Sequence, residues 1–436
     1  MKAPQSPPRG HSVCAGMQNS IHFGQAYSLL ALALTLLFSA PARAQALSLP
    51  GEGGPEAVVR PPASEGKADC ESFQALSENG RYLALTSHYY YGVKDCPHVV
   101  VWDTEKKKRL VVIEGKDHSI GMKVYKVFDD GKALASDGRR VFLFDAKTKE
   151  TLWSLKLSRR VLAADISEDG KYLATSSFWE HPIKWFNLVK FWEIGKAKKI
   201  SLLSNMDIST YGVLKVEFFR LGGKLRALVC ECAGARCWVV DPRTGSVKKK
   251  IRIEWNPMYG LALMPSGDGA LFSQHGEGGK GVCFVDFGKG TKRALVGHPG
   301  ITTDCCILGV KENIYFVSAD EKGFVCVWEG KDFLPKWWFQ EKREEEKWEI
   351  WSVHLNVVHG KGRKYLVVAT DWVVKDPGNF DPIDSSVELS WWDPEKKKCV
   401  RRARVGSVWE EMAPTGKWKP VGGKPGFHST PVEAVK

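Results

Sequence analysis

The chain has 436 residues, among them 17 Trp, and carries a formal net charge of +13. Strand-sized apolar runs bounded by Gly, Pro, Asp and Lys dominate, and helical periodicity is nearly absent beyond the N-terminus, which excludes helical and α/β classes. The positive balance permits attraction to anionic surfaces or acidic partners. Because Lys clusters such as Lys106–Lys108 and Lys396–Lys398 recur at equivalent turns, they indicate solvated turns, and no specific nucleic-acid signal remains.

At the start of the chain, residues 1–46 are predicted to be a signal peptide with a long n-region. The apolar run Ala26–Ala40 is followed by small residues, so cleavage after Ala44 or Ala46 fits the small-x-small rule. An uncleaved membrane anchor is the alternative, for which the run is short. We therefore expect an exported protein, periplasmic or extracellular, that contacts a membrane only if this segment is retained.

A repeated unit organises most of the remaining chain. Ile166–Ile194 contains a Ser-Glu-Asp-Gly turn, an alternating strand, a loop and a strand whose Trp192 is followed by an acid, and Leu76–Asp103 is similar. Strands ending in an acid recur with gaps of 42, 48, 48, 45, 43 and 64 residues; the acids are Asp103, Asp145, Glu193, Asp241, Asp286, Glu329 and Asp393. This is roughly the 40–50-residue period of a propeller blade. The sequence therefore predicts an all-β, seven-bladed β-propeller of four-stranded antiparallel blades over residues 70–405.

From about Phe73 to Val405, these units resemble WD-repeat β-propeller blades. In the sixth unit, Gly297-His298 opens the repeat and Val327-Trp328-Glu329 closes its third strand. The resemblance implies a buried polar network; its members here are His298, Ser318, Asp320 and Trp328. It implies nothing about activity, because propellers host many functions.

Three segments flank or close the predicted ring. Residues 47–69 are rich in Gly, Pro and Glu and are predicted to be a linker. Within it, Ala57–Arg60 could complete a blade from the other end of the chain, although Cys399–Val405 also offers an outer strand for blade 7. After Val405 the repeat pattern stops, so residues 406–436 are predicted to be a disordered tail.

The cysteines of an exported chain lie in an oxidising compartment. Cys232 and Cys237 flank a tight turn and are expected to face each other across a hairpin. Cys70 and Cys96 both lie in the first blade and could join its edge. Third-strand cysteines such as Cys283 are instead expected to be small buried hydrophobes.

A search for catalytic motifs finds no metalloprotease, nucleophile-elbow, phosphate-loop or dinucleotide pattern, and we predict no catalytic residue, cofactor or metal. A weaker similarity to the repeats of pyrroloquinoline-quinone-dependent dehydrogenases is carried by Val141–Trp153 and Asp241–Gly245. The alternative to a scaffold is therefore a quinoprotein-type dehydrogenase or a propeller hydrolase or lyase. Buried carboxylates or His residues converging on the central channel would favour that alternative.

Three expanded connections between second and third strands give the predicted binding site: His88–His98, Phe178–Asn187 and Asp371–Ser386. In four-stranded blades these connections leave on one face. The aromatic residues that they carry are Tyr89, Tyr90, Tyr91, Phe178, Trp179, Trp185, Trp372 and Phe380. Exposed aromatic side chains are typical of binding hot spots, although these rings could instead cap their own blades. We expect a non-enzymatic scaffold that docks a protein partner on this face, with Tyr90, Trp179 and Trp372 exposed.

Overall fold

The computed structural model describes residues 59–60, 71–87, 98–115, 121–180, 185–195, 199–208, 213–231, 236–253, 260–274, 281–343, 347–360, 362–375, 382–406, 408–414, 416–417, 419–420 and 428–432. The chain divides into two compact units, Met1–Glu56 and Ala57–Lys436, and every described residue belongs to the second. The predicted signal peptide and most of the predicted linker lie outside the described residues. No described residue belongs to a helix with the length and hydrophobicity needed to cross a bilayer.

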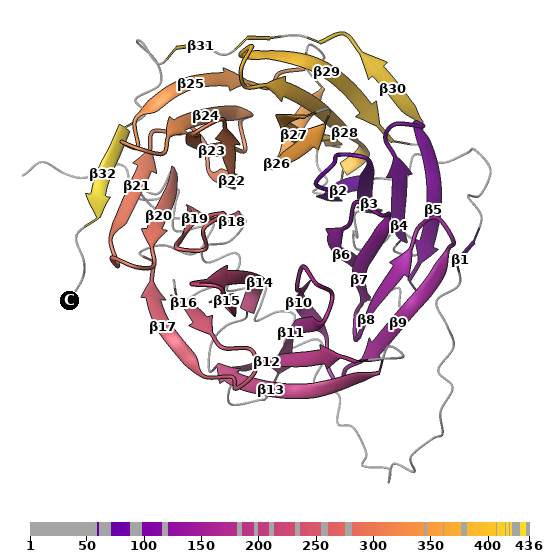
Figure 1. The fold of residues 1–436 in the computed structure, drawn as a ribbon. Helices are drawn as coiled ribbons and strands as arrows, with labels where there is room; N and C mark the ends of the chain where they lie inside the picture. The colour runs from indigo at the N-terminus through magenta and orange to yellow at the C-terminus, as the bar shows by residue number, and fades with distance from the viewer. Residues whose placement is uncertain are drawn as a thin grey trace, which may run out of the picture. The chain divides into compact units, whose positions relative to one another are not determined.

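Seven antiparallel sheets follow one another around a ring, each built from four strands consecutive in sequence, which confirms the predicted fold (Figure 1). The first four blades are β2–β5 (Glu71–Leu76, Tyr82–Ser87, His98–Asp103, Lys108–Glu114), β6–β9 (Met122–Val127, Lys132–Asp137, Arg140–Asp145, Glu150–Lys156), β10–β13 (Val161–Ile166, Tyr172–Glu180, Trp185–Ile194, Ile200–Ile208) and β14–β17 (Val213–Leu221, Lys224–Glu231, Arg236–Val240, Val247–Arg252). The last three are β18–β21 (Leu261–Leu263, Gly269–Gln274, Gly281–Asp286, Lys292–Val296), β22–β25 (Thr302–Val310, Asn313–Asp320, Phe324–Glu329, Pro335–Gln340) and β26–β29 (Trp348–Gly360, Arg363–Lys375, Pro382–Asp393, Lys398–Val405).

Hydrophobic clusters fill the boundaries between neighbouring blades. The third-strand Trp of a blade packs against the blade before it: Trp192 lies between blades 2 and 3, and Trp328 between blades 5 and 6. Another cluster joins Phe73 of blade 1 to Trp391 of blade 7. Each buried side chain of this size contributes roughly 1.5–3 kcal/mol. The last boundary of the ring is therefore held by the same kind of packing as the others.

Among the described strands, none is shared between the two chain ends to close the ring. The short strand β1 (Val59–Arg60) does form, but it pairs with β5 of blade 1 instead of completing blade 7. The outer strand of blade 7 is β29, which contains the Cys399–Val405 run. At the seam, the Asp371 carboxylate accepts the backbone N–H of Phe73 at 2.9 Å. Blades 7 and 1 are thus joined by side-chain packing and a hydrogen bond.

The C-terminal segment differs from the predicted disordered tail. Three short strands add a fifth, outermost strand to blades 7, 6 and 5 in turn: β30 (Trp409–Met412), β31 (Lys419–Pro420) and β32 (His428–Val432) (Figure 1). A strand added at an edge gains ladder hydrogen bonds without needing an alternating apolar pattern, which is why the sequence gives no signal for it. Pro is also tolerated on an outermost strand, since its missing N–H faces away from the sheet.

The acids that revealed the repeat cap the turns between third and fourth strands. The side chains of Asp103, Asp145 and Asp393 accept backbone N–H groups two and three residues further on. Four residues after the acid, the chain takes a left-handed conformation; these residues are Lys107, Lys149, Gly245, Gly290, Phe333 and Lys397. A short carboxylate is suited to such a turn because it can bond its own backbone locally. The periodic acids therefore mark a recurring turn geometry.

The four side chains of the implied repeat network come together in blade 6. His298 Nε2 lies 2.7 Å from Ser318 Oγ, and the Trp328 indole N–H donates to the same oxygen at 2.8 Å. The Asp320 carboxylate lies 3.4 Å from His298 Nδ1 and accepts the backbone N–H of Gly300. None of the four network residues is more than 2% exposed. A buried polar network of this kind rigidifies the blade.

Candidate functional site

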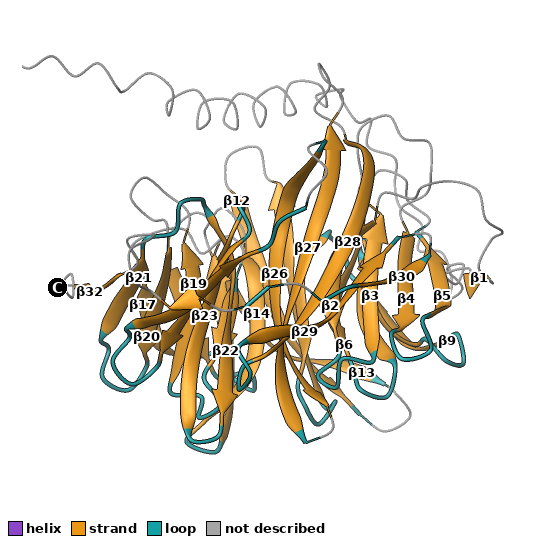
Figure 2. Ribbon diagram, turned by 90° about the horizontal axis from the view of Figure 1, so that it is seen from above, coloured by secondary structure: helices purple, strands orange, loops and turns teal. Residues whose placement is uncertain are grey.

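Blade 7 is taller than its neighbours on one face of the ring. In blade 6, the second strand continues from Phe316, opposite Trp328, to Asp320. In blade 7, it continues from Leu366, opposite Trp392, to Lys375. The extra residues Asp371–Lys375 add about 16 Å at roughly 3.3 Å per residue. Figure 2 shows β27 and β28 reaching beyond the other strands.

The predicted long loops of blades 3 and 7 are mostly paired strands, which corrects the prediction. In blade 3, Phe178, Trp179 and Glu180 pair with Asn187, Phe186 and Trp185. In blade 7, Asp371–Val374 pairs with β28. Both strands of each hairpin lengthen together, so their backbone groups are satisfied by the ladder. The raised surface is therefore a pair of extended hairpins.

The predicted aromatic residues fare differently from one another. Trp372 is only 4% exposed, so its predicted exposure is wrong. In the raised strands of blade 3, the structure describes the backbone of Phe178, Trp179 and Trp185 but not their side chains. The remaining predicted aromatic residues lie wholly outside the described residues: Tyr89, Tyr90, Tyr91 and Phe380. Their predicted exposure stays a prediction.

An arginine contacts the raised end of blade 7 beside the buried Trp372. The Arg343 guanidinium lies 3.7 Å from the ring centroid of Trp348 and 5.9 Å from that of Trp372. Arg343 also donates to Ser386 Oγ at 3.1 Å. Such cation–π contacts contribute about 0.5–2 kcal/mol each, more when desolvated. The raised hairpin is therefore held rigidly against the connection that enters the blade.

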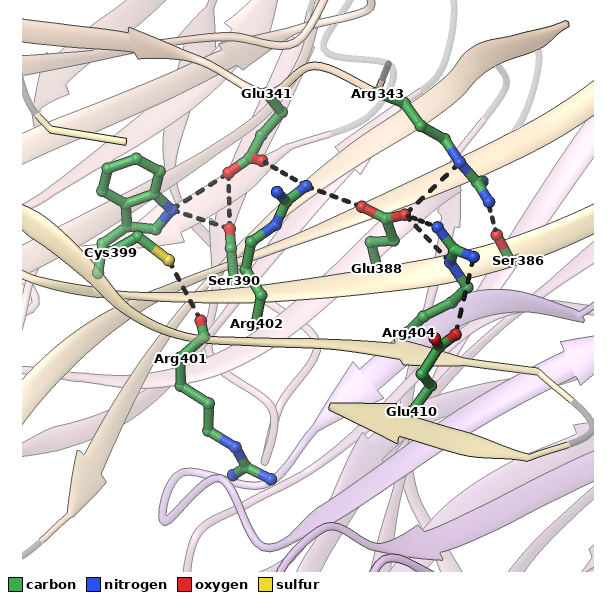
Figure 3. A network of polar contacts seen from close by, with 11 residues as sticks. Glu341, Arg343, Ser386, Glu388, Ser390, Cys399, Arg401, Arg402, Arg404 and Glu410 are labelled. Carbon is green, nitrogen blue, oxygen red and sulfur yellow. Dashed lines mark hydrogen bonds and ion pairs between the residues drawn. The ribbon is translucent and has the colours of Figure 1, made fainter. Parts of the chain in front are cut away.

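Behind this buttress lies a buried charge network (Figure 3). The Glu388 carboxylate, 4% exposed, accepts hydrogen bonds from Arg402 at 2.9 Å and Arg404 at 3.2 Å, and lies 3.7 Å from Arg343. Its neighbour Glu341 accepts from Ser390 Oγ at 2.6 Å and from the Trp392 indole at 3.1 Å. Burial raises the pKa of Glu341, while Ser390 and Arg402 act in the opposite direction. All of these charges are engaged within blade 7 and its boundary with blade 6.

Trp351 is an exposed aromatic residue that the sequence analysis missed. It is 44% exposed and occupies a β-bulge in the raised part of β26, between the pairs Ile350–Trp372 and Ser352–Asp371. A bulge redirects a side chain out of the strand's alternation. The sequence signal is weak, because the adjacent apolar residues Ile350 and Trp351 break the alternation expected of a strand.

Ionisable side chains also occur on the inner strands, where they would favour an enzyme. Three carboxylates on the first and second strands, however, bind a backbone N–H of the next blade. Asp165 accepts that of Phe218 at 2.7 Å, Asp304 that of Leu355 at 2.8 Å, and Asp371 that of Phe73 at 2.9 Å. These three residues therefore act as links between consecutive blades.

Glu217 and two lysines are the remaining inner-strand charges of note. Burial raises the pKa of Glu217 to about 7, and it makes no hydrogen bond or ion pair with the described residues. Burial, followed by repulsion from Lys215 and Arg160, lowers the pKa of Lys123 to about 8. Because Lys123 belongs to blade 2 and Lys215 to blade 4, their interaction crosses the inner space of the ring. With its pKa raised to about 7, Glu217 can exchange a proton near neutral pH.

Ser352, His354 and Asp371 have the composition of a hydrolytic triad but not its geometry. His354 Nε2 lies 3.0 Å from Ser352 Oγ and 3.5 Å from Asp371, so one ring nitrogen faces both partners. Ser352 donates directly to Asp371 at 2.7 Å. A triad needs the acid on the other imidazole nitrogen. This cluster instead supports the seam with blade 1, where the His354 ring stacks on Phe73 at 5.1 Å.

No group of three or more His, Cys, Asp or Glu side chains in the described residues is arranged to hold a metal ion. No protein-family model and no curated protein matches the sequence. Among solved structures, the fold is similar to the WD40 domain of Pan2 from Neurospora crassa, with 12% identity and a TM-score of 0.47, covering 69% of this chain and 86% of that one. The chain's own sheet order shows a seven-bladed propeller of four-stranded blades, a fold that hosts many functions, so its function must be argued from its own surface.

Proposed function

We propose that this protein is an exported, non-enzymatic scaffold that docks a protein partner on the face bearing the raised hairpins of blades 3 and 7. The observation that carries the proposal is the buttressed end of blade 7 with Trp351 exposed beside it. A rigid, partly exposed indole costs little conformational entropy to immobilise, and Trp is enriched among residues that dominate binding energy.

The use of the inner-strand carboxylates supports a scaffold over an enzyme. Three of these carboxylates already accept hydrogen bonds from backbone N–H groups of adjacent blades: Asp165, Asp304 and Asp371. A general base or nucleophile needs a free oxygen within reach of the substrate. These three residues therefore stabilise the contacts between blades and are not arranged as catalytic groups.

Export is supported by the apolar run Ala26–Ala40 and the small residues after it. Its test is N-terminal sequencing of the protein purified from its native host. We expect a mature start near Gln45 or Leu47 in the envelope or extracellular fraction. Recovery of Met1 or Met17 on a soluble cytoplasmic product would overturn export and leave the docking surface untouched.

The docking surface is tested by quantitative capture from the native envelope fraction with full-length wild-type protein, Trp351→Ala and Leu202→Ala as baits. Leu202 is a matched control because it is 49% exposed but lies on the outer strand of blade 3. We expect one captured protein to be depleted with Trp351→Ala and retained with Leu202→Ala. Equal recovery on all three baits would contradict the proposed face.

A hydrolase or lyase is the second candidate, and Glu217 is the observation that favours it. A carboxyl group with a pKa of about 7 suits general acid–base chemistry at neutral pH. An enzyme predicts that Glu217→Gln abolishes turnover of any substrate found while partner capture persists. A scaffold predicts that neither the wild type nor Glu217→Gln turns over any substrate, while both capture the partner equally.

A further inference from the structure

Blade 4 brings two cysteines together at an unusually short distance. Cys230 on β15 and Cys237 on β16 stand directly opposite each other in the antiparallel ladder. Their sulfur atoms are 2.8 Å apart, and the two residues are 2% and 0% exposed. Two unbonded sulfur atoms do not approach so closely. Directly opposite residues in such a ladder have Cβ atoms about 4.5–5.5 Å apart, within a small adjustment of what a disulfide needs.

An ion pair fixes the register that creates this contact. Glu231 directly follows Cys230 and Arg236 directly precedes Cys237, so both lie one residue nearer to the hairpin turn. The Arg236 guanidinium binds both oxygens of the Glu231 carboxylate, at 2.6 and 3.2 Å, although Glu231 is fully buried. A bidentate pair is geometrically specific. Slipping the ladder by one residue would break this pair and turn the side chains to the opposite faces.

We propose that Cys230 and Cys237 form a disulfide bond within blade 4. This replaces the predicted Cys232–Cys237 contact, because the ladder places Cys230 opposite Cys237; Cys232 itself lies outside the described residues. The bond forms when one thiolate displaces a thiol from a disulfide of the glutathione or oxidoreductase class and the second thiolate then resolves the mixed disulfide. The two cysteines lose two electrons and two protons, and the oxidant becomes two thiols.

Burial sets the order of events. It raises the pKa of the Cys237 thiol, and the neighbouring Cys230 raises it further. Since the thiolate is the reactive form, the folded, reduced blade is a poor substrate for exchange. The bond therefore forms during folding, before blades 4 and 5 pack together around these cysteines.

The test uses the full-length chain, reduced and denatured, then refolded in reduced and oxidised glutathione. Free thiols are blocked with N-ethylmaleimide, and the protein is digested with trypsin and Glu-C without reductant. Cleavage after Glu231 separates Cys230 from Cys232. We expect the peptide ALVCE (227–231) to be linked to CWVVDPR (237–243). The link is expected to vanish in Cys230→Ser and to persist in Cys232→Ser.

A link through the peptide CAGAR (232–236), a link to Cys283, or blocked thiols at both positions would overturn the proposal. Because the wild-type chain is assayed directly, this result does not depend on any variant folding. The bond in the cell also rests on the proposed export. A bond after refolding, with free thiols in protein taken from its native host, would overturn export and leave the pairing intact.

Discussion

In blade 6 the Trp328 indole donates to Ser318 on the second strand, whereas in blade 7 the Trp392 indole donates to Ser390 on its own strand. The two hydroxyl groups nevertheless lie at the same register position of the pair formed by the second and third strands. Ser318 stands opposite Cys326, two residues before Trp328, and Ser390 stands opposite Val368, two residues before Trp392. The hydroxyl group has changed strand while staying at the same register and on the same face. A bonded indole can therefore survive the loss of its sequence signature.

The second difference between these blades is charge. Where blade 6 has His298 against its serine, blade 7 has Glu341. A buried carboxylate costs several kcal/mol unless it is paired and hydrogen-bonded. In blade 7, Arg402 lies 4.0 Å from Glu341 and donates to Glu388 at 2.9 Å. The acidic substitution is thus accommodated by a network of arginines that blade 6 does not use.

The largest expected effect follows from removing the centre of that network. Glu388→Gln leaves Arg343 and Arg402, both largely buried, without their shared carboxylate. Breaking a buried pair in this way typically costs about 3–5 kcal/mol. Urea unfolding of the variant measures the loss. Glu410→Gln is the matched control, since Glu410 is 60% exposed beside Arg404 and is expected to change stability by less than about 1 kcal/mol. Similar losses for both variants would contradict the assigned roles.

The exchange of the hydroxyl group between strands can be tested by reversing it. Ser390→Cys removes one of the two acceptors of the Trp392 indole and the hydroxyl group that donates to Glu341, and is expected to cost about 1–3 kcal/mol. Val368→Ser supplies a hydroxyl at the position that Ser318 occupies in blade 6. In a double-mutant cycle, the two changes together are expected to cost about 1 kcal/mol less than the sum of their separate effects. Strict additivity would show that the two positions are not equivalent.

Stability is expected to be lower at pH 7.5 than at pH 5.5, because burial raises the pKa of Glu217 from 4.5 to about 7 and two further groups are shifted in the same direction. Burial raises the pKa of Glu341 above its usual 4.5. Burial lowers the pKa of His354, but Asp371 and Asp304 outweigh this effect and leave it above its usual 6.5. The folded state holds these protons more tightly than the unfolded chain, so the stabilisation is complete below the unfolded pKa and lost as pH rises through the folded pKa. Lys123, lowered to about 8 from 10.5, acts in the opposite direction above this window.

Urea titrations at the two pH values measure this slope. Glu341→Gln is expected to flatten part of this slope and to leave the contributions of His354 and Glu217. An equal or greater free energy of unfolding at pH 7.5 in the wild type would contradict the protonation states inferred for these groups.

The smallest effect is expected at the turns between third and fourth strands. Lys397 in blade 7 has a φ of 52°, and its ammonium lies over the Trp337 ring at 4.3 Å. Lys397→Gly relieves a left-handed conformation but loses that contact and raises the chain entropy of the unfolded state, so the net change is expected within about 0.5 kcal/mol. Phe333 at the equivalent turn of blade 6 stacks on Phe316, and Phe333→Gly is expected to be clearly destabilising. Equal melting temperatures for the two variants would refute this contrast.

The sequence predicted the ring because its strongest signals are local. Acids such as Asp103 and Asp393 accept backbone hydrogen bonds within their own turns. The residues that define the repeat period therefore do not depend on distant contacts. The network of His298 and Trp328 was likewise marked by a resemblance at those residues. The seven-bladed count survived the long gap before Asp393 because the additional residues lengthen existing strands.

The missed features depend on ladder and side-chain contacts that residue composition does not mark. The Asp, Pro and Gly of Asp371–Ser386 predict a loop, yet pairing extends both strands into it. Trp372 is buried beside Arg343, and the hairpin register that pairs Cys230 with Cys237 depends on Glu231 and Arg236. Strands such as Trp409–Met412 gain their order from an edge already present.

The most direct measurement compares binding and stability in one pair of variants. With the captured partner purified, dissociation constants and melting temperatures are determined for the wild type, Trp351→Ala and Leu202→Ala. We expect Trp351→Ala to weaken binding about 30-fold, the equivalent of about 2 kcal/mol, with an unchanged melting temperature. Leu202→Ala is expected to leave both quantities unchanged. If Trp351→Ala instead lowers the melting temperature by several degrees and leaves the dissociation constant as in the wild type, the residue caps its own blade and the raised end of blade 7 is not the docking surface.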